Sequence, residues 1–209
     1  AGAGAAMAVS EPLTETPRRP VAGVTAPQGF HAGAAAAGIK HGMPDKDGTR
    51  LDVAVIYSDC PATAAAVFTT NKVKAAPVVI SQLNLAAGGA RAVVVNSGNA
   101  NACTGSQGFK DALLMGKLTA DELDLDPSQV LVASTGVIGR FLPMDRIREG
   151  VVAAARAVTP VGGDAAAEAI MTTDTRPKQA SAGFDHGGRH FPTLRTSTGP
   201  GVLPLNTCL

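Results

Sequence analysis

The sequence predicts a layered domain of α/β class, in its α+β form, because short strands come first and helices follow. Apolar runs of strand length, rich in β-branched residues and separated by glycines, fill the first half of the chain. Apolar residues recur at helical spacing in the second half. Aromatic residues are only 3% of the 209 residues and Trp is absent, so small aliphatic side chains must build the core. This length suits one sizeable domain.

The strand signals are short, buried-type runs. LDVAVIY, residues 51–57, reads as a buried strand. We expect four more strands, at residues 65–69, 77–81, 92–96 and 129–133.

The helix signals follow a different period. Residues 107–123 carry apolar side chains at helical spacing, and Thr104 or Ser106 can cap the start. Pro143 is suited to the first turn of a second helix that continues to about residue 158. Asp164 can cap a third helix that ends near residue 170. The predicted apolar face of the first helix consists of Phe109, Ala112, Leu113, Gly116, Ala120 and Leu123.

Composition sets the domain limits and excludes several functions. We expect a flexible leader at residues 1–23, one domain at residues 24–183, and an atypical tail at residues 184–209 without regular structure.

A net charge of +1 and few aromatics argue against nucleic-acid binding. No apolar run reaches membrane-spanning length, so we expect a soluble, cytoplasmic protein. Three separated cysteines predict reduced, buried thiols rather than disulfides or a metal site.

Two polar turns follow predicted strands and could bind a ligand. VNSGNANACTG, residues 95–105, places asparagines and glycines where a strand ends. STGVIG, residues 134–139, could expose backbone N–H groups beside the hydroxyl of Thr135, as an oxyanion requires. Each could equally be a turn whose polar side chains only satisfy local backbone groups. Spacing alone does not decide between these interpretations.

A third polar segment is MTTDT, residues 171–175, which Arg176 and Lys178 follow. Hydroxyls, a carboxylate and cations could hold an amino-acid substrate, although such clusters usually end helices or form turns. The four histidines lie in loop-like stretches and are expected at the surface. The acidic residues 121–126 are expected at a solvated helix end.

Five segments, in this order, resemble the ornithine acetyltransferase family: GVTAPQGFHAGAAAAGIK, VFTTNKVKAAPV, VNSGNANACTG, STGVIGRFLPMD and AIMTTDTRPKQA. The resemblance implies a layered αββα fold similar to that of N-terminal-nucleophile hydrolases. It implies a precursor that cuts itself before a Thr into α and β chains, which assemble as an α2β2 heterotetramer. The new N-terminal Thr takes the acetyl group of N-acetylornithine, releases ornithine, and passes the acetyl group to glutamate. Some members also accept acetyl-CoA as a substrate, and no other cofactor is implied.

The resemblance also assigns roles to three residues. Thr135, by its hydroxyl, and Gly136, by its backbone N–H, match the Thr-Gly pair that stabilises the oxyanion, and Thr172 matches a substrate-binding Thr. From Phe191 onward the sequence departs from the family, and residues 206–209 are only a degenerate echo of the cleavage site. We therefore expect this polypeptide to need a β chain for catalysis. Two alternatives stay open: a related self-processing aminopeptidase, and a non-catalytic fragment that only pairs with a partner chain.

Overall fold

The computed structural model describes residues 23–40, 50–86, 88–186, 189–198 and 201–205, and beyond residue 180 it describes the backbone alone. The predicted leader, apart from Gly23, lies outside the described residues, and so does the echo of the cleavage site at residues 206–209.

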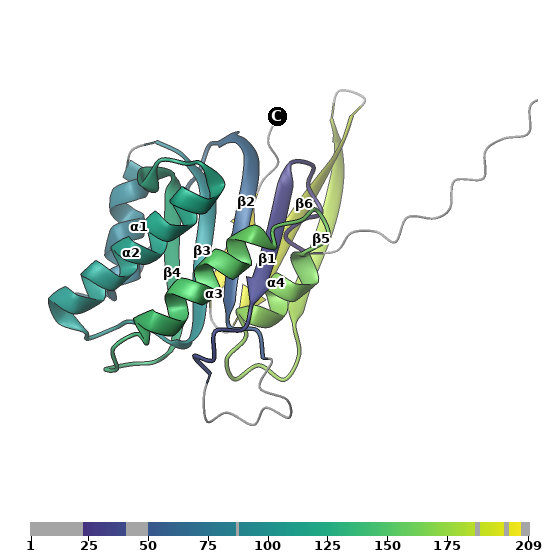
Figure 1. Cartoon of the computed structure of the whole chain (residues 1–209). Coiled ribbons are helices and arrows are strands. Elements are labelled where there is room, and N and C mark those ends of the chain that lie inside the picture. Colours follow the sequence, from purple (N-terminus) through teal and green to yellow (C-terminus); the bar gives the residue numbers. More distant parts are fainter. Residues whose placement is uncertain (1–22, 41–49, 87, 187–188, 199–200, 206–209) are drawn as a thin grey trace, which may run out of the picture.

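A four-stranded mixed sheet forms the centre of the molecule (Figure 1). Its strands are β1 (Phe30–Ala35), β2 (Val53–Ala62), β3 (Ala90–Asn99) and β4 (Val130–Val137), in that order. β1 and β3 run antiparallel to β2, whereas β4 runs parallel to β3. The predicted strands at residues 51–57, 92–96 and 129–133 are confirmed by β2, β3 and β4.

β1 gave no strand signal because its sequence, FHAGAA, contains no β-branched residue. Close packing explains these small residues. A Cβ atom added to Gly33 would lie 2.2 Å from the carbonyl oxygen of Ala154 in the helix above it. The sequence of this strand is therefore determined by the helix that packs on it rather than by the strand propensity of its residues.

The two faces of the sheet carry different helices. α1 (Ala76–Ala86), α2 (Gly105–Leu123) and α3 (Met144–Arg156) pack in the core cluster that also contains Val53 of β2. α4 (Gly163–Ala169) packs with Ala54 and Ile56, whose side chains alternate with those of the first cluster along β2. The mixed, layered α/β prediction is therefore confirmed.

Two strand predictions are wrong. Residues 77–81 lie in helix α1, where Pro77 occupies the first turn and its missing N–H costs no hydrogen bond. A short apolar run of this kind does not distinguish a buried strand from a buried helix. Residues 65–69 form no strand, and Val67 in that stretch is 99% exposed.

The helix predictions are confirmed, with corrections to their faces and caps. α2 buries Ala112, Gly116 and Ala120 as predicted, but Phe109 and Leu113 are exposed. The Thr104 hydroxyl does not cap α2, and the Asp164 carboxylate does not cap α4. Neither helix has a side-chain hydrogen bond at its N-cap position. Pro143 precedes α3 as its N-cap residue rather than lying in its first turn.

The predicted unstructured tail is also wrong. β5 (Lys178–His186), β6 (Arg189–Thr198) and β7 (Gly201–Leu205) form a second, antiparallel sheet in that order. Gln179, at the start of β5, donates a 2.9 Å hydrogen bond to Asp164 of α4, so this sheet begins beside that helix. Its Gly-, Pro- and Thr-rich sequence has no alternating apolar pattern, which is why sequence reasoning missed it.

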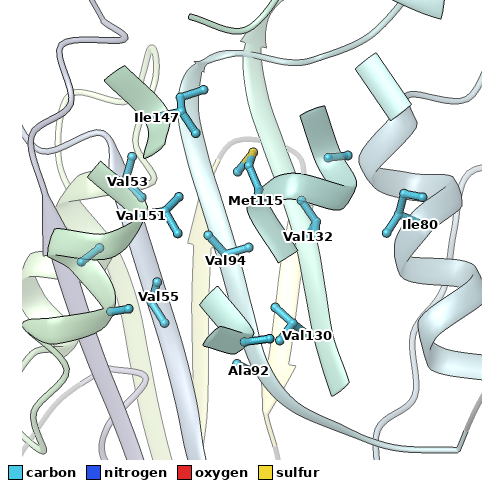
Figure 2. Packing of buried hydrophobic residues seen from close by; sticks show 14 of the residues in the cluster. Val53, Val55, Ile80, Ala92, Val94, Met115, Val130, Val132, Ile147 and Val151 are labelled. Carbon is cyan, nitrogen blue, oxygen red and sulfur yellow. The ribbon is translucent and has the colours of Figure 1, made fainter. Parts of the chain in front are cut away.

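The core beneath α1–α3 is aliphatic, as the scarcity of aromatics requires. Figure 2 shows Met115 of α2 among valines of three strands and residues of α1 and α3. Its side chain is fully buried. The labelled residues of this cluster are Val53, Val55, Ile80, Ala92, Val94, Met115, Val130, Val132, Ile147 and Val151.

Because Met115 fills the centre of this cluster, Met115→Ala should lower the free energy of unfolding by about 2–5 kcal/mol. Leu113→Ala is the matched control on the same helix, since Leu113 is 55% exposed, and it should change stability by less than about 0.5 kcal/mol. Urea unfolding followed by circular dichroism measures both values. Equal losses in the two variants would contradict this placement of α2.

Candidate functional site

Two of the predicted polar motifs form one edge of the sheet. β3 and β4 are parallel and joined through helix α2, so their carboxyl ends meet. In the register of this pair Ser97 lies opposite Thr135, and Gly98 lies opposite Gly136. The two strand ends that sequence reasoning treated separately are therefore neighbours in space.

The two glycines bring the backbones of these motifs into direct contact. Gly136 has a φ of +130°, which L side chains rarely adopt. A Cβ atom at this position would lie 2.3 Å from the carbonyl carbon of Gly98 and 2.6 Å from the amide nitrogen of Asn99. Only glycine fits here without a shift of the backbone. We refer to the strand ends at residues 96–99 and 134–137 as the β3–β4 edge.

Three asparagines that were candidate ligand donors have structural roles. Asn96 donates to the Asn99 carbonyl at 2.9 Å and accepts from the Ser134 hydroxyl at 2.6 Å. Asn99 donates to the carbonyls of residues 140 and 141 and accepts from the Asn101 amide at 2.8 Å. Asn101 donates to the Gly108 carbonyl at 2.8 Å. Their amide groups fix the turns, which agrees with the local interpretation of this motif.

Thr135 differs from these asparagines. Its side chain is half-buried, and Gly136 beside it is exposed. Within the described part of the chain, no hydrogen bond engages the Thr135 hydroxyl. The β3–β4 edge therefore presents an uncommitted hydroxyl next to an exposed glycine, an arrangement that could stabilise a developing negative charge.

The third motif follows the end of α4, and this helix end is hydrogen-bonded to the β3–β4 edge. The carbonyl oxygen of Ala169 accepts hydrogen bonds from the Ser97 hydroxyl and from the Lys40 ammonium, the latter at 3.0 Å. Ser97 is the register partner of Thr135. Thr172, which is half-buried, follows Ala169 by three residues. Asp174 forms an ion pair with Lys178, which neutralises two of the charges that were considered for substrate binding.

Lys40 was not singled out by the sequence, where it only ends one of the five segments. Its side chain is 6% exposed, and its ammonium also donates to the Leu51 carbonyl at 2.8 Å. Burial above all, together with the nearby charge of Arg50, lowers the pKa of Lys40 to about 8, although Asp52 and Glu168 oppose the shift. The Asp52 carboxylate is itself buried and accepts the backbone N–H groups of Ala37 at 2.6 Å and Ile39 at 2.5 Å.

Other candidate groups lie elsewhere. His31 lies in β1 rather than in a loop, and it bonds to Asp59 at 2.8 Å. Cys60 and Cys103 are exposed, so the prediction of buried thiols is wrong for both. Glu122 of the acidic run pairs with Arg156, as expected of a solvated helix end.

A hollow of about 380 Å³ lies at the opposite, amino ends of β3 and β4. Its lining consists of Pro61, Ala62, Gly89, Ala90, Arg91, Asp126, Ser128 and Gln129.

The layered α/β architecture is that of solved ArgJ structures, which have an N-terminal-nucleophile-hydrolase-like fold. The model of the ArgJ family matches residues 31–207, and the chain belongs to this family. Similar relatives include arginine biosynthesis bifunctional proteins ArgJ from Symbiobacterium thermophilum, 52% identical over 184 residues, and Dehalococcoides mccartyi, 46% identical over 187 residues. These matches cover 88% and 90% of this chain but 45% of each relative. The chain therefore spans less than half the length of these relatives.

Two solved structures agree with this assignment. The ArgJ protein of Bacillus halodurans matches with a TM-score of 0.77 and 38% identity, over 87% of this chain and 92% of that chain. Ornithine acetyltransferase from Mycobacterium tuberculosis, solved in complex with ornithine, matches with a TM-score of 0.72 and 40% identity, over 87% of this chain and 93% of that chain. The resemblance and fold inferred from the five segments are confirmed. None of the described helices is long and apolar enough to span a membrane.

Gly136→Ala should lower the free energy of unfolding by roughly 3 kcal/mol or more, because the new Cβ clashes with backbone atoms and the φ is strained. Gly139→Ala is the matched control: Gly139 also has a positive φ, of +78°, but an added Cβ there meets nothing within 4 Å. It should cost only about 1–2 kcal/mol. Urea unfolding of both variants measures the difference, and equal costs would contradict the contact between Gly98 and Gly136.

The lowered pKa of Lys40 predicts a pH dependence of stability. Between pH 8 and pH 10.5 the unfolded chain, in which Lys40 keeps its ordinary pKa, binds more protons than the folded chain. The free energy of unfolding should therefore rise with pH across this window, by up to about 3 kcal/mol, and the gain should be absent below it. Urea unfolding from pH 7 to pH 11 measures this in the native chain and in Lys40→Met, which removes the titrating group. An identical pH dependence in both chains would refute the shift.

Proposed function

We propose that the chain forms the α-chain part of a glutamate N-acetyltransferase of arginine biosynthesis, which moves the acetyl group of N-acetylornithine to glutamate. The observation that carries the proposal is the β3–β4 edge, where the Thr135 hydroxyl lies beside Gly136 and where Ser97 binds the carbonyl of Ala169, three residues before Thr172. The names of the relatives support the pathway, and the ornithine bound to the Mycobacterium tuberculosis protein supports the substrate class.

In this reaction a Thr hydroxyl from the second half of the family's sequence attacks the acetyl carbonyl of N-acetylornithine. A tetrahedral oxyanion forms, the C–N bond breaks, and protonated ornithine leaves behind an acetyl ester. The glutamate amine then attacks the ester through a second oxyanion and restores the Thr hydroxyl. The residues of this chain stabilise both oxyanions by the Thr135 hydroxyl and the Gly136 N–H, while Thr172 binds the amino-acid substrate. No cofactor takes part, and acetyl-CoA would enter only as an alternative acetyl donor.

The rest of the family's sequence, on the same polypeptide or as a separate β chain, supplies the nucleophile in this proposal. The surface next to the site suits such a partner. Ile138 and Phe141, which follow Gly136 by two and five residues, are 65% and 66% exposed, and exposed apolar residues beside a site often mark an interface. We propose an assembly of the α2β2 type, located in the cytoplasm. Transfer to glutamate, rather than to water, distinguishes this enzyme from a related aminopeptidase.

Thr135→Ala should lower kcat about a hundred- to a thousandfold, because it removes one oxyanion donor worth roughly 2.7–4 kcal/mol. The KM for N-acetylornithine should change much less, because the donor acts chiefly in the transition state. Thr172→Ala should instead raise the KM for N-acetylornithine more than it lowers kcat. Steady-state acetyl transfer measures these effects in this chain co-expressed with the second half of the Symbiobacterium thermophilum relative.

Thr135→Ser is the matched control, since it keeps the hydroxyl and should retain most of the turnover. Near-normal turnover of Thr135→Ala would assign Thr135 to a local structural role. A wild-type pair that releases acetate but acetylates no glutamate would favour the aminopeptidase instead.

A further inference from the structure

The end of helix α4 is held by two side chains from distant parts of the sequence. Ala169 is the last residue of α4, and its carbonyl belongs to the group at a helix end that has no partner within the helix. Lys40 and Ser97 both donate to this oxygen. We call these two hydrogen bonds the Ala169 clamp.

The clamp is fully enclosed. Ala169 and Ser97 are 0% exposed, and Lys40 is 6% exposed. The two residues that follow, Ile170 and Met171, are also buried, so the chain leaves α4 through the interior before it reaches Thr172. Water therefore has little access to these bonds, and their loss would leave a buried carbonyl short of donors.

Both donors are themselves fixed to the β3–β4 edge. Ser97 belongs to β3 opposite Thr135, and its amide donates to the Asp52 carbonyl at 2.8 Å. The backbone of Lys40 packs on the same edge, because a Cβ atom added to Gly98 would lie 3.1 Å from the Lys40 nitrogen. The Asp52 carboxylate holds the loop that precedes Lys40.

We propose that Lys40 and Ser97 are positioning residues, which hold the Ala169 carbonyl and thereby set where Thr172 lies relative to Thr135 and Gly136. The inference rests on the proposed function, in which Thr172 binds the substrate and Thr135 faces its reacting carbonyl. Neither Lys40 nor Ser97 touches the substrate. The clamp acts by joining three segments that are separate in sequence.

Hydrogen exchange in this chain tests the clamp without any activity. The amides of Ile170 and Met171 donate to the carbonyls of Ala166 and Glu168, so they report opening of the end of α4. Lys40→Met and Ser97→Ala should each speed exchange at residues 169–174 by roughly ten- to a hundredfold. Ser81→Ala is the matched control, since the buried Ser81 hydroxyl bonds to the Val132 backbone elsewhere on β4, and it should leave this exchange unchanged.

Unchanged exchange at residues 169–174 in both clamp variants, or an equal increase in Ser81→Ala, would overturn the clamp. Kinetics of the co-expressed pair test its consequence. Lys40→Met should raise the KM for N-acetylornithine about tenfold while kcat falls less than about threefold, and Ser81→Ala should change neither. A fall in kcat with unchanged KM would overturn the positioning of Thr172. If the wild-type pair transferred no acetyl group, the proposed function would fail, and the exchange measurement would still decide the clamp.

Discussion

The parallel pairing of β3 with β4 is the constraint on which the site depends. Parallel strands end at the same edge, and here the pairing continues past the apolar core to Gly98 and Gly136, where the two backbones touch. No side chain fits between them. The Thr135 hydroxyl therefore emerges from a hydrogen-bonded strand rather than from a free loop, which limits its freedom before any ligand arrives. Donors fixed in this way need little reorganisation when charge develops, and that is the main source of electrostatic stabilisation in acyl transfer.

Buried polar groups connect this edge to the other face of the sheet. Asp52, Ser97 and Lys40 lie where an apolar core would be expected, and their side chains form hydrogen bonds to backbone groups. Burial of such groups costs free energy unless every donor and acceptor is satisfied, so the arrangement favours one geometry over nearby alternatives. The lowered pKa of Lys40 reflects this cost. Loop, strand and helix end are held together by hydrogen bonds that specify direction, whereas the aliphatic core beneath α1–α3 specifies only proximity.

Local patterns predicted the parts of the fold that local forces determine. The valine-rich strands and the periodic helices α2 and α3 were visible, and so were the two polar turns that follow β3 and β4. β1 could not be predicted, because its alanines and glycine are required by the close packing of a helix on the strand and not by strand propensity. The strand predicted at residues 77–81 is wrong, because a short apolar run suits either a strand or a helix. The meeting of Ser97 with Thr135 depends on register, and the contact of Lys40 with Ala169 spans most of the chain. Neither is encoded in spacing. The roles of Thr135, Gly136 and Thr172 came from family resemblance and stay predictions.

In the proposed function, an acetyl oxygen is bound at the β3–β4 edge. A crystal structure of this chain paired with the second half of a relative, trapped as the acetyl-enzyme, tests it most directly. We predict that the ester carbonyl oxygen lies about 2.7–3.1 Å from both the Thr135 hydroxyl oxygen and the Gly136 backbone nitrogen. An ester oxygen that points away from both atoms and is held by donors outside this edge would contradict the claim.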